Sequence, residues 1–556
     1  MRIKQSLAIG TSLWMALAAP SLACGGLFCQ QIPVDQTGEK ILFATDGQNV
    51  TAHVQIAYQG DAKSFSWIVP VPTPPKLEAG TDSLFTVLRE ATRPQFQLEI
   101  RDEGPCEPRI LREREYDRKD SGAKNEATVT RPSVTVISQE QVGPYDTVVL
   151  QANEPGVLKD WLRKNHYVIP AKLDPLLDPY VAGKYSFVAL KLTKDKAVGD
   201  IQPIVMTYKA TKPGIPIRLT SVAAQSNMDV FVWVLGSERA IPENYRHADI
   251  NEARIDWLGG GQNYKDVVTR AVDEAGGQAF VTDYAGRSSV VKAERFSRAH
   301  FQLDVLAKTH DPVAFAQAVV AGGYFGERNG SLNSTALVAF LKKYIAKPKS
   351  LAKTADLEFY RFIENHGEAL REARITVNSA KAAQELESRF VKPAGQVAKM
   401  LDRYGYLTAM YTTMSPEEMT QDPTFRFNAK LGTVAMVRHA DGVRRCRKGV
   451  AYEVTPVEIT LRNGRKFTVP GNGNYWRGRY GGAPTQAEAM PAAARIEQLA
   501  ATGEGAVIQD NTAVIARALQ DPATPSKPAA PFNAQFGAAA GLLLVGGLGW
   551  RRLRKR

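Results

Sequence analysis

Four cysteines are the residues whose chemistry this sequence constrains most: Cys24, Cys29, Cys106 and Cys446. Only Cys24 and Cys29 are neighbours, with Gly-Gly-Leu-Phe between them. A zinc site would require close CxxC pairs with further Cys or His ligands, and a redox-active pair would require the same missing spacing. If the chain is exported, which its first residues indicate below, an even number of cysteines favours disulfide bonds. Of the three pairings that four cysteines allow, we predict a local Cys24–Cys29 bond, which leaves Cys106 to bond Cys446.

Histidine, the commonest metal ligand and acid–base group, is sparse in this chain. The seven histidines are His53, His166, His247, His300, His310, His366 and His439. No two of them lie within four residues of each other, so local spacing predicts no metal-binding pair. The sequence also lacks the GxSxG, HExxH, Walker and GxGxxG motifs. We therefore predict no catalytic residue, no metal ligand and no cofactor site from local motifs, and only a site assembled from distant residues stays open.

Carboxylates occur in two arrangements that could do acid–base chemistry. Asp82, Asp229 and Asp283 are far apart in the sequence and could meet in a cleft of the folded chain. The segment from Glu364 to Glu368, Glu-Asn-His-Gly-Glu, places two carboxylates around one histidine. A glycine at this position is typical of a helix end, so helix capping and solvation is the preferred interpretation of that segment.

Aromatic and basic residues give three weaker signals for binding. Residues 471–482 mix tyrosine, tryptophan and arginine, and could stack on sugars or bases, although a flexible loop is the preferred interpretation. Trp67 and Trp233 lie in predicted strands, and we expect both in the core. The basic run Arg444–Lys448 is expected to be a solvated loop, with a patch that binds anions as the alternative.

The net charge of +13 on 556 residues would be compatible with nucleic-acid binding, but its distribution argues against it. Seven basic residues belong to the two ends of the chain: Arg2, Lys4, Arg551, Arg552, Arg554, Lys555 and Arg556. Without them, 63 basic residues face 57 acidic ones, a net charge of about +6 for the body. The apolar content of 44% and charged content of 23% are those of an ordinary globular protein. We predict no nucleic-acid partner.

The first residues have the pattern of a secretory signal. Basic Arg2 and Lys4 precede an apolar stretch from Leu7 to Ala19, and small residues follow. Ser21 and Ala23 fit the small-x-small rule for cleavage, so we predict a signal peptide over residues 1–23. Cys24 would then be the first mature residue, and its acylation stays open as an alternative.

The C-terminal end has the pattern of a membrane anchor. A proline-rich spacer ends at Pro531, and residues 532–550 carry no charge and end on Trp550. We predict a transmembrane helix over residues 532–550 and a basic cytoplasmic tail over residues 551–556. The protein would then be a single-pass cell-membrane protein with its bulk on the periplasmic or extracellular side. A C-terminal sorting tail has the same layout, and cleavage there is the alternative.

Residues 24–300 are predicted to form a strand-rich α+β domain. Alternation of apolar and polar residues predicts strands at Val50–Tyr58 and Ser64–Pro72, which we expect to pair as a hairpin. Pro70 and Pro72 place the second strand at a sheet edge or end it. We also predict a strand at Ile217–Leu219.

The remaining residues divide into three predicted regions. Residues 301–420 are expected to be helical, with Pro393 as a break or kink between two helices. Residues 421–470 are expected to form a small β region, with the Asn463-Gly464 turn closing a hairpin. Residues 471–531 are rich in Gly, Ala and Pro and are expected to be a flexible linker, apart from a helix near 486–500.

Several segments together resemble a bacterial family known as domain of unknown function 2330. They are Cys24-Gly-Gly-Leu-Phe-Cys29, Trp67-Ile-Val-Pro-Val-Pro72, Arg218-Leu-Thr-Ser221, Val230-Phe-Val-Trp-Val-Leu-Gly236 with Pro242-Glu-Asn-Tyr245, and Ala279-Phe-Val-Thr-Asp-Tyr-Ala-Gly286. The resemblance covers most of residues 24–300 and extends more weakly through residues 414–423. It implies an envelope protein with a signal peptide and often a C-terminal membrane segment, and it implies no activity.

The sequence thus predicts an α+β protein: a strand-rich exported N-terminal region, a helical segment, a small second β region and a C-terminal transmembrane helix. Its partners would be the membrane, through that helix, and an envelope glycan or protein. The first hypothesis for function is a binding or structural module of the envelope. The alternative is an envelope hydrolase whose site is assembled from distant residues, which a deep polar pocket with convergent Asp, Glu or His would favour.

Overall fold

A computed structural model describes seven stretches of the chain: residues 35–59, 66–106, 135–167, 171–193, 201–325, 335–471 and 487–520. The predicted signal peptide, Cys24, Cys29 and the C-terminal helix at residues 532–550 lie outside these stretches. Among the described residues, no helix has the length and apolar character needed to cross a membrane. The described chain is a mixed α+β protein, as predicted.

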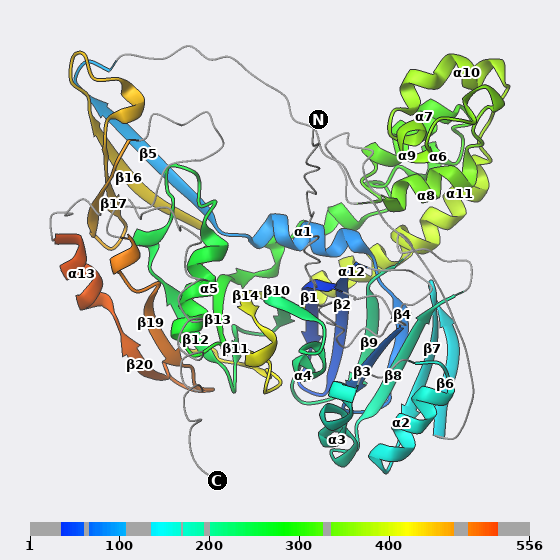
Figure 1. Ribbon diagram of the computed structural model, residues 1–556, viewed down its shortest axis with the longest axis horizontal. Helices are drawn as coiled ribbons and strands as arrows, with labels where there is room; N and C mark the ends of the chain where they lie inside the picture. The colour runs from blue at the N-terminus through cyan, green and yellow to red at the C-terminus, as the bar shows by residue number, and fades with distance from the viewer. Residues whose placement is uncertain are drawn as a thin grey trace, which may run out of the picture.

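A ten-stranded sheet forms the centre of the molecule, with the strand order β20-β19-β12-β13-β14-β10-β1-β2-β9-β4 (Figure 1). Its strands are β1 (Asp35–Thr45), β2 (Asn49–Gln59), β4 (Lys76–Ala79), β9 (Ile204–Lys209), β10 (Ala224–Gly236), β12 (Arg246–Ile250), β13 (Ala279–Arg287), β14 (Tyr406–Met414), β19 (Ala493–Gln498) and β20 (Ala506–Asp510). The pairs β1–β10 and β12–β13 are parallel, and the other neighbours are antiparallel. The sheet therefore joins strands from three of the regions that the sequence separates.

A second, antiparallel sheet packs on one face of the β1–β2–β9 part. It has the order β3-β8-β7-β6, with β3 (Ser66–Val71), β8 (Ser186–Leu192), β7 (Tyr145–Gln151) and β6 (Thr135–Val142). Ile41 and Phe43 meet Val69 and Val188 between the sheets. The helices α2 (Pro155–Lys164) and α3 (Asp174–Ala182) cover the outer face of this sheet.

The predicted hairpin between β2 and β3 is wrong, although both strands exist. β2 pairs with β1 and β9, whereas β3 pairs only with β8 in the other sheet. Because β3 is buried on both faces, it needs a layer on each side, which a two-stranded hairpin cannot supply. The edge position expected from Pro70 is confirmed, since β3 is the outermost strand of its sheet.

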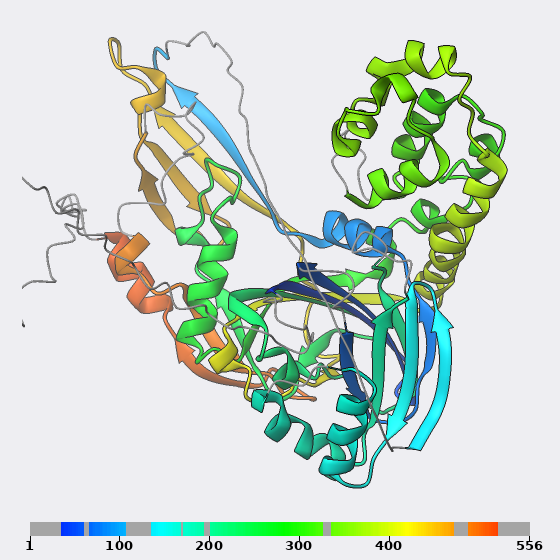
Figure 2. The ribbon, with the colours of Figure 1, turned by 45° about the vertical axis from the view of Figure 1, so that its right-hand side comes forward.

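Helices cover the opposite face of the central sheet and then extend away from it (Figure 2). α1 (Asp82–Thr92) and α12 (Lys392–Arg403) lie against the sheet, and the helical lobe beyond them contains α6 (Leu303–Leu306), α7 (Pro312–Ala321), α8 (Thr335–Tyr344), α9 (Asp356–Arg361), α10 (Gly367–Glu372) and α11 (Ser379–Leu386). One continuous apolar core joins sheet, α1 and lobe. A π-helical turn at Glu387–Val391 links α11 to α12 just before Pro393, close to the predicted break.

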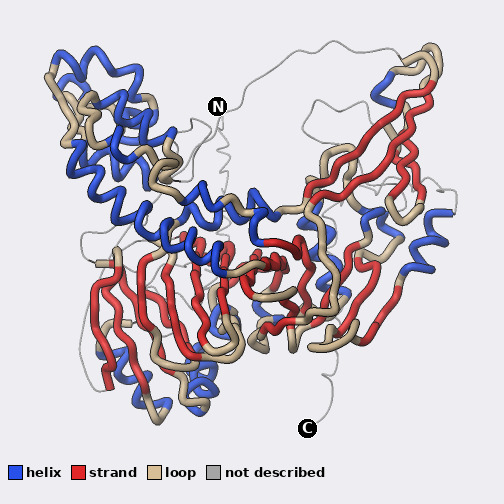
Figure 3. Tube along the Cα trace, turned by 180° about the vertical axis from the view of Figure 1, so that it is seen from behind, coloured by secondary structure: helices blue, strands red, loops and turns tan. Residues whose placement is uncertain are grey.

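A β arm rises from the other end of the central sheet, away from the helical lobe (Figure 3). It contains β5 (Gln95–Glu103), which runs parallel to β16 (Val437–Arg445), followed by the hairpin of β17 (Val457–Leu461) and β18 (Lys466–Val469). The hairpin predicted from Asn463-Gly464 is confirmed, and Gly464 has the positive φ of +81° that this turn requires.

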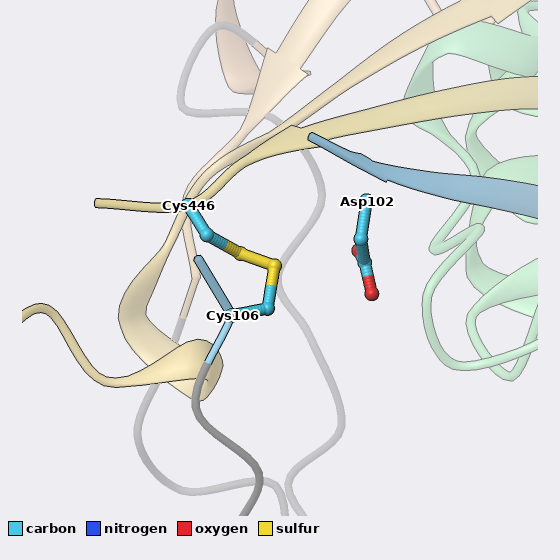
Figure 4. A group of neighbouring side chains, drawn as sticks. All are labelled: Asp102, Cys106 and Cys446. Carbon is cyan, nitrogen blue, oxygen red and sulfur yellow. A yellow bond between two sulfur atoms is a disulfide. The ribbon is translucent and has the colours of Figure 1, made fainter. Parts of the chain in front are cut away.

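A disulfide bond between Cys106 and Cys446 closes the tip of the β arm, as expected for this pair (Figure 4). The two Cα atoms are 5.1 Å apart, and the amide of Cys446 donates to the carbonyl of Glu103. The neighbouring Arg444 is buried, pairs with Asp102 at 3.1 Å and lies 3.8 Å from the ring of Tyr452. The start of the basic run is therefore a structural contact of the arm, contrary to the solvated loop expected for it.

Two short segments differ from their predicted secondary structure. Ile217–Thr220 is a single helical turn, α4, whose apolar residues enter both cores beside it. The helix expected near 486–500 is wrong, because Ala493–Gln498 forms β19 between β12 and β20 and buries Ala493 and Ile496. Cross-strand packing outweighs the helical propensity of alanine there. The helices α5 (Tyr264–Glu274) and α13 (Thr512–Gln520) complete this end of the molecule.

Replacing Cys106 and Cys446 by serine should lower the free energy of unfolding by about 4–5 kcal/mol, because the bond closes a loop of 340 residues in the unfolded chain. Urea unfolding under oxidising conditions measures the change. The matched control is the double variant Cys24→Ser, Cys29→Ser, which leaves the arm intact. Recovery of a Cys106 peptide that is not joined to Cys446, from unreduced wild-type protein, would contradict the pairing.

Candidate functional site

A cavity of about 110 Å³ lies between the two packed sheets. Its wall is mostly apolar. Strand β1 contributes Ile41 and Phe43, β2 contributes Ala52 and Val54, and β9 contributes Met206 and Tyr208. The segment Trp67–Pro72 contributes all of its residues except Ile68. The exposed Lys212 and Pro72 also line the cavity, so it reaches the surface beside them. Concave, largely apolar sites with a few polar groups are the usual form of small-ligand sites in proteins.

One carboxylate, that of Glu39, faces this cavity from the central strand β1. Residues 39, 41 and 43 lie on one face of β1 because side chains alternate along a strand, so Glu39 shares its face with Ile41 and Phe43. Its side chain is only 4% exposed, and its Oε2 atom has no hydrogen-bond partner among the described residues. A buried carboxylate oxygen without a partner is costly, and the polar head of a bound ligand would supply the missing partner.

Burial alone determines how Glu39 titrates. Desolvation raises the pKa of Glu39 from its ordinary value of 4.5 to about 7. Near neutral pH the group therefore exists in both forms. The protonated form can donate a hydrogen bond to a ligand oxygen, and the ionised form can accept one from a hydroxyl or a cation. The site can thus recognise a polar head while its walls hold an apolar body.

A polar rim lies at the other side of the cavity, around Asp422. The hydroxyl of Tyr180 donates to Oδ2 of Asp422 at 2.6 Å, and the amide of Arg218 donates to Oδ1 at 3.1 Å. The Nδ2 atom of Asn244 donates to the carbonyl of Asp422 at 2.7 Å, and the hydroxyl of Tyr245 donates to Gln421. Burial is the main cause that raises the pKa of Asp422. The rim is thus a satisfied network that fixes one wall of the cavity.

Four segments that carry the family resemblance meet around this cavity. The Trp67–Pro72 segment forms one wall, and the segments at Arg218–Ser221, Pro242–Tyr245 and Met414–Pro423 hold the rim through the bonds to Gln421 and Asp422. Phe280, from a fifth segment, packs on Tyr245 and on Phe425, which in turn packs on Phe43 in the cavity wall. Segments far apart in the sequence therefore build one site.

Fold and site together define a class: an α+β protein with two packed sheets and, between them, a largely apolar pocket lined by the carboxyl groups of Glu39 and Asp422. The chain belongs to the family DUF2330, described as an uncharacterized protein conserved in bacteria, whose model matches residues 18–358. Neither the curated proteins nor the solved structures contain a match to this chain.

The three aspartates that could have met in a cleft do not form one joint site. Asp229 accepts a hydrogen bond from the hydroxyl of Tyr411 at 2.6 Å, and Asp283 accepts one from the hydroxyl of Tyr264. The rings of Tyr411 and Tyr264 stack 6.0 Å apart, so these two carboxylates belong to one layer between sheet and α5. Asp82 instead begins α1.

Each of these aspartates is bound within the fold. Asp82 accepts a hydrogen bond from Gln55 at 2.6 Å, and Asp229 also pairs with Lys265 at 3.0 Å. Burial raises the pKa of Asp283 to about 7, but its bond from Tyr264 directs the carboxylate into the protein. We read this layer as structural, in contrast to Glu39, whose free atom faces a cavity.

The other candidates from the sequence divide between core, surface and cavity. Trp233 is a core residue as predicted, with its Nε1 donating to Thr92 at 2.9 Å. Trp67 differs, because its half-buried ring lines the cavity and packs only partly into the core. His366 stacks on Phe359, and Glu364 and Glu368 are exposed, as the solvation interpretation expects. The helix stop expected at Gly367 is wrong, because Gly367 has helical backbone angles and begins α10, without a side-chain cap. Residues 472–482 lie outside the described stretches.

Sequence reasoning missed Glu39 as a site residue. Its only local signal is an acidic residue on the apolar face of a strand whose next members are Ile41 and Phe43. That pattern could have been noticed, because a charge inside an apolar alternation is either an edge or a functional position. The contribution of β3 to the same cavity could not, since it depends on a sheet that pairs residues 66–71 with residues 186–191.

Glu39→Gln should reduce the pH dependence of stability between about pH 4.5 and pH 7 by the contribution of Glu39, while the contribution of Asp283, whose pKa burial also raises to about 7, remains. The folded state holds the proton of Glu39 more tightly than the unfolded state does. The contribution of Glu39 to stability is therefore fully present below pH 4.5 and is lost as the pH rises to about 7. The loss amounts to about 3 kcal/mol for a shift of this size. Urea unfolding at a series of pH values measures it.

The matched control for this experiment is Glu99→Gln, which removes an exposed carboxylate of β5. The slope between pH 4.5 and pH 7 should stay at the wild-type value in that control. Equal slopes for wild type and Glu39→Gln would mean that Glu39 has the same pKa in the folded and the unfolded protein. That result would contradict the raised pKa of Glu39 in the folded state.

Proposed function

We propose that this protein is an exported binding protein of the bacterial envelope, tethered by its C-terminal segment. Its ligand is a small molecule with an apolar body and a head that carries a hydroxyl or amino group. The observation that carries the proposal is the unpartnered Oε2 atom of Glu39, which lines a largely apolar cavity. A ligand head would satisfy this atom, and the walls formed by Trp67 and Tyr208 would desolvate the ligand body.

The proposed location rests on the two ends of the sequence and on the disulfide. A signal peptide at residues 1–23 and an anchor at residues 532–550 would place the described body outside the cytoplasm. The Cys106–Cys446 bond is consistent with this location, because structural disulfides persist in oxidising compartments and are rare in the cytosol of mesophiles. Acylation of Cys24 and cleavage of the tail stay alternatives to a simple transmembrane anchor.

A hydrolase is the second candidate, and the raised pKa of Glu39, about 7, favours it. A carboxyl group with that pKa could act as a general acid or base near neutral pH. Catalysis would further need a nucleophile or second acid–base group within hydrogen-bond reach. The candidates for that role in the described lining are engaged elsewhere: Lys212 pairs with Glu243 at 2.7 Å, the hydroxyl of Thr424 donates to Asn244 at 3.2 Å, and Asp422 is bonded by Tyr180. Binding without turnover is therefore the better-supported function.

The neutral probe phenol should bind the full chain saturably, because a single apolar ring with one hydroxyl suits a cavity of about 110 Å³ with one hydrogen-bonding group. Ala52→Leu fills the cavity from β2 and should weaken binding by about tenfold or more, which corresponds to about 1.4 kcal/mol. Trp67→Phe keeps an aromatic wall, so binding should persist while the change in tryptophan fluorescence on binding decreases. Fluorescence titration gives both readouts.

Ala44→Leu is the matched control, since Ala44 is equally buried on the same strand layer but faces the helical core. It should bind the probe like wild type, provided that circular dichroism shows a folded protein. Probe binding that is the same in Ala52→Leu and wild type would place the probe elsewhere and contradict the proposed site. Turnover of ester, peptide or glycan substrates that is abolished by Glu39→Gln would favour the hydrolase.

Truncation after residue 525 should release the body from membranes, because it removes the uncharged segment 532–550. Cell fractionation followed by a high-salt wash measures the release, with the full chain as the reference. A truncated body that still sediments with membranes would show that this segment is not the anchor. The Cys24→Ser variant of the truncated chain would then test acylation as the tether.

A further inference from the structure

The strands β12 and β19 lie toward one end of the central sheet (Figure 1). They carry a cluster of three potential metal ligands, His247, Asp249 and Glu497. His247 and Asp249 are two residues apart on β12, so they project on the same face of the sheet. Glu497 lies opposite His247 on the antiparallel strand β19. From these residues we propose a site for a divalent transition-metal ion of the zinc type, with His247, Asp249 and Glu497 as its ligands.

The distances between the three groups fit a shared ion better than they fit hydrogen bonds. Nδ1 of His247 lies 3.7 Å from Oδ1 of Asp249 and 3.9 Å from Oε2 of Glu497. Both separations exceed the range of a hydrogen bond. Two atoms that bind one tetrahedral zinc ion, each at about 2.1 Å, are about 3.4 Å apart. Small side-chain rotations would therefore bring all three atoms into coordination distance.

The histidine provides the independent sign of a ligand. His247 is only 4% exposed, and its Nδ1 atom has no hydrogen-bond partner among the described residues. The other ring nitrogen, Nε2, lies 3.0 Å from Oγ1 of Thr282. An Nε2–H that donates to Thr282 leaves the lone pair of Nδ1 directed at the two carboxylates. Metal-binding histidines commonly use the second nitrogen in this way, because that bond fixes the ring.

The surroundings of the cluster decide which ion fits. Arg495 donates to Oε1 of Glu497 at 3.0 Å, which leaves Oε2 on the side of His247. Arg239 reaches Thr282, with 3.4 Å between the donor and Oγ1. The positive charges of Arg495 and Arg239 repel a bound cation. They therefore disfavour Mg²⁺ and Ca²⁺, whose binding to carboxylates depends mainly on charge. An imidazole ligand favours Zn²⁺, Co²⁺ and Ni²⁺ instead.

Asp249 leaves the site open to solvent. Its side chain is 54% exposed, whereas that of Glu497 is 14% exposed. An ion can enter from that side, and a water molecule would complete a tetrahedral set of three protein ligands. This site is separate from the Glu39 cavity, since none of its three residues lines that cavity.

The test uses the full chain after removal of metals with EDTA. Titration with Co²⁺ should produce visible d–d absorption with one equivalent bound, and Zn²⁺ should abolish that absorption by displacement. Asp249→Asn and His247→Gln should each weaken Zn²⁺ binding by about 100-fold or more in competition with a chromophoric chelator, which is at least the effect of losing a supporting residue of a metal site. Millimolar Ca²⁺ or Mg²⁺ should not displace the bound ion.

Asp441→Asn, which removes an exposed carboxylate of the β arm, is the control and should bind like wild type. Because Asp249 is largely exposed, its variant keeps the test valid even where His247→Gln fails to fold. The proposal is overturned by wild-type protein that binds no equivalent of Co²⁺ or Zn²⁺, by Asp249→Asn binding at the wild-type affinity, or by displacement with Ca²⁺.

Discussion

The parallel pairing of β1 with β10 is the interaction on which the rest of the structure depends. It joins residues 36–44 to residues 224–235 at the middle of the ten-stranded sheet. Strands at that position are covered on both faces, so each residue of β1 must suit one of two cores. Leu42 and Ala44 enter the core shared with the helices, whereas Ile41 and Phe43 enter the core between the sheets.

The same pairing explains why a binding cavity can exist beside Glu39. The second sheet supplies the opposite wall, and its strand β3 is apolar enough to be buried on both faces. The loop around Asp422 closes the rim from a part of the chain more than 350 residues later than β1, through its bonds from Tyr180 and Arg218. The cavity is thus a product of long-range packing, whereas each of its walls has an ordinary local structure.

This division also determines what the sequence could predict. Local periodicity and turn chemistry located β2, β3, most helices and the Asn463-Gly464 hairpin. Strand partners were not predictable in the same way, because register and neighbour depend on which apolar faces meet after folding. The proposed β2–β3 hairpin and the helix near residue 493 failed for that reason. Glu39 was missed because the apolar surroundings that perturb its acidity come from β2, β3 and β9.

Buried polar groups in this protein differ in whether a cavity or other ligand groups lie beside them. Asp229, Asp283 and the indole nitrogen of Trp233 each have a hydrogen-bond partner within the fold, which offsets part of the cost of burying them. Glu39 and His247 each have a buried atom without such a partner, and each of these atoms faces either a cavity or two carboxylates. These two positions combine an unpartnered buried atom with a cavity or with neighbouring ligand groups. We therefore place the binding capacity of the protein there. The two sites differ in chemistry. The cavity offers the acid Glu39 in largely apolar surroundings, whereas the strand pair β12–β19 offers the imidazole of His247 with the acids Asp249 and Glu497. The pocket between the sheets therefore suits an organic ligand, and the strand pair β12–β19 suits a metal ion.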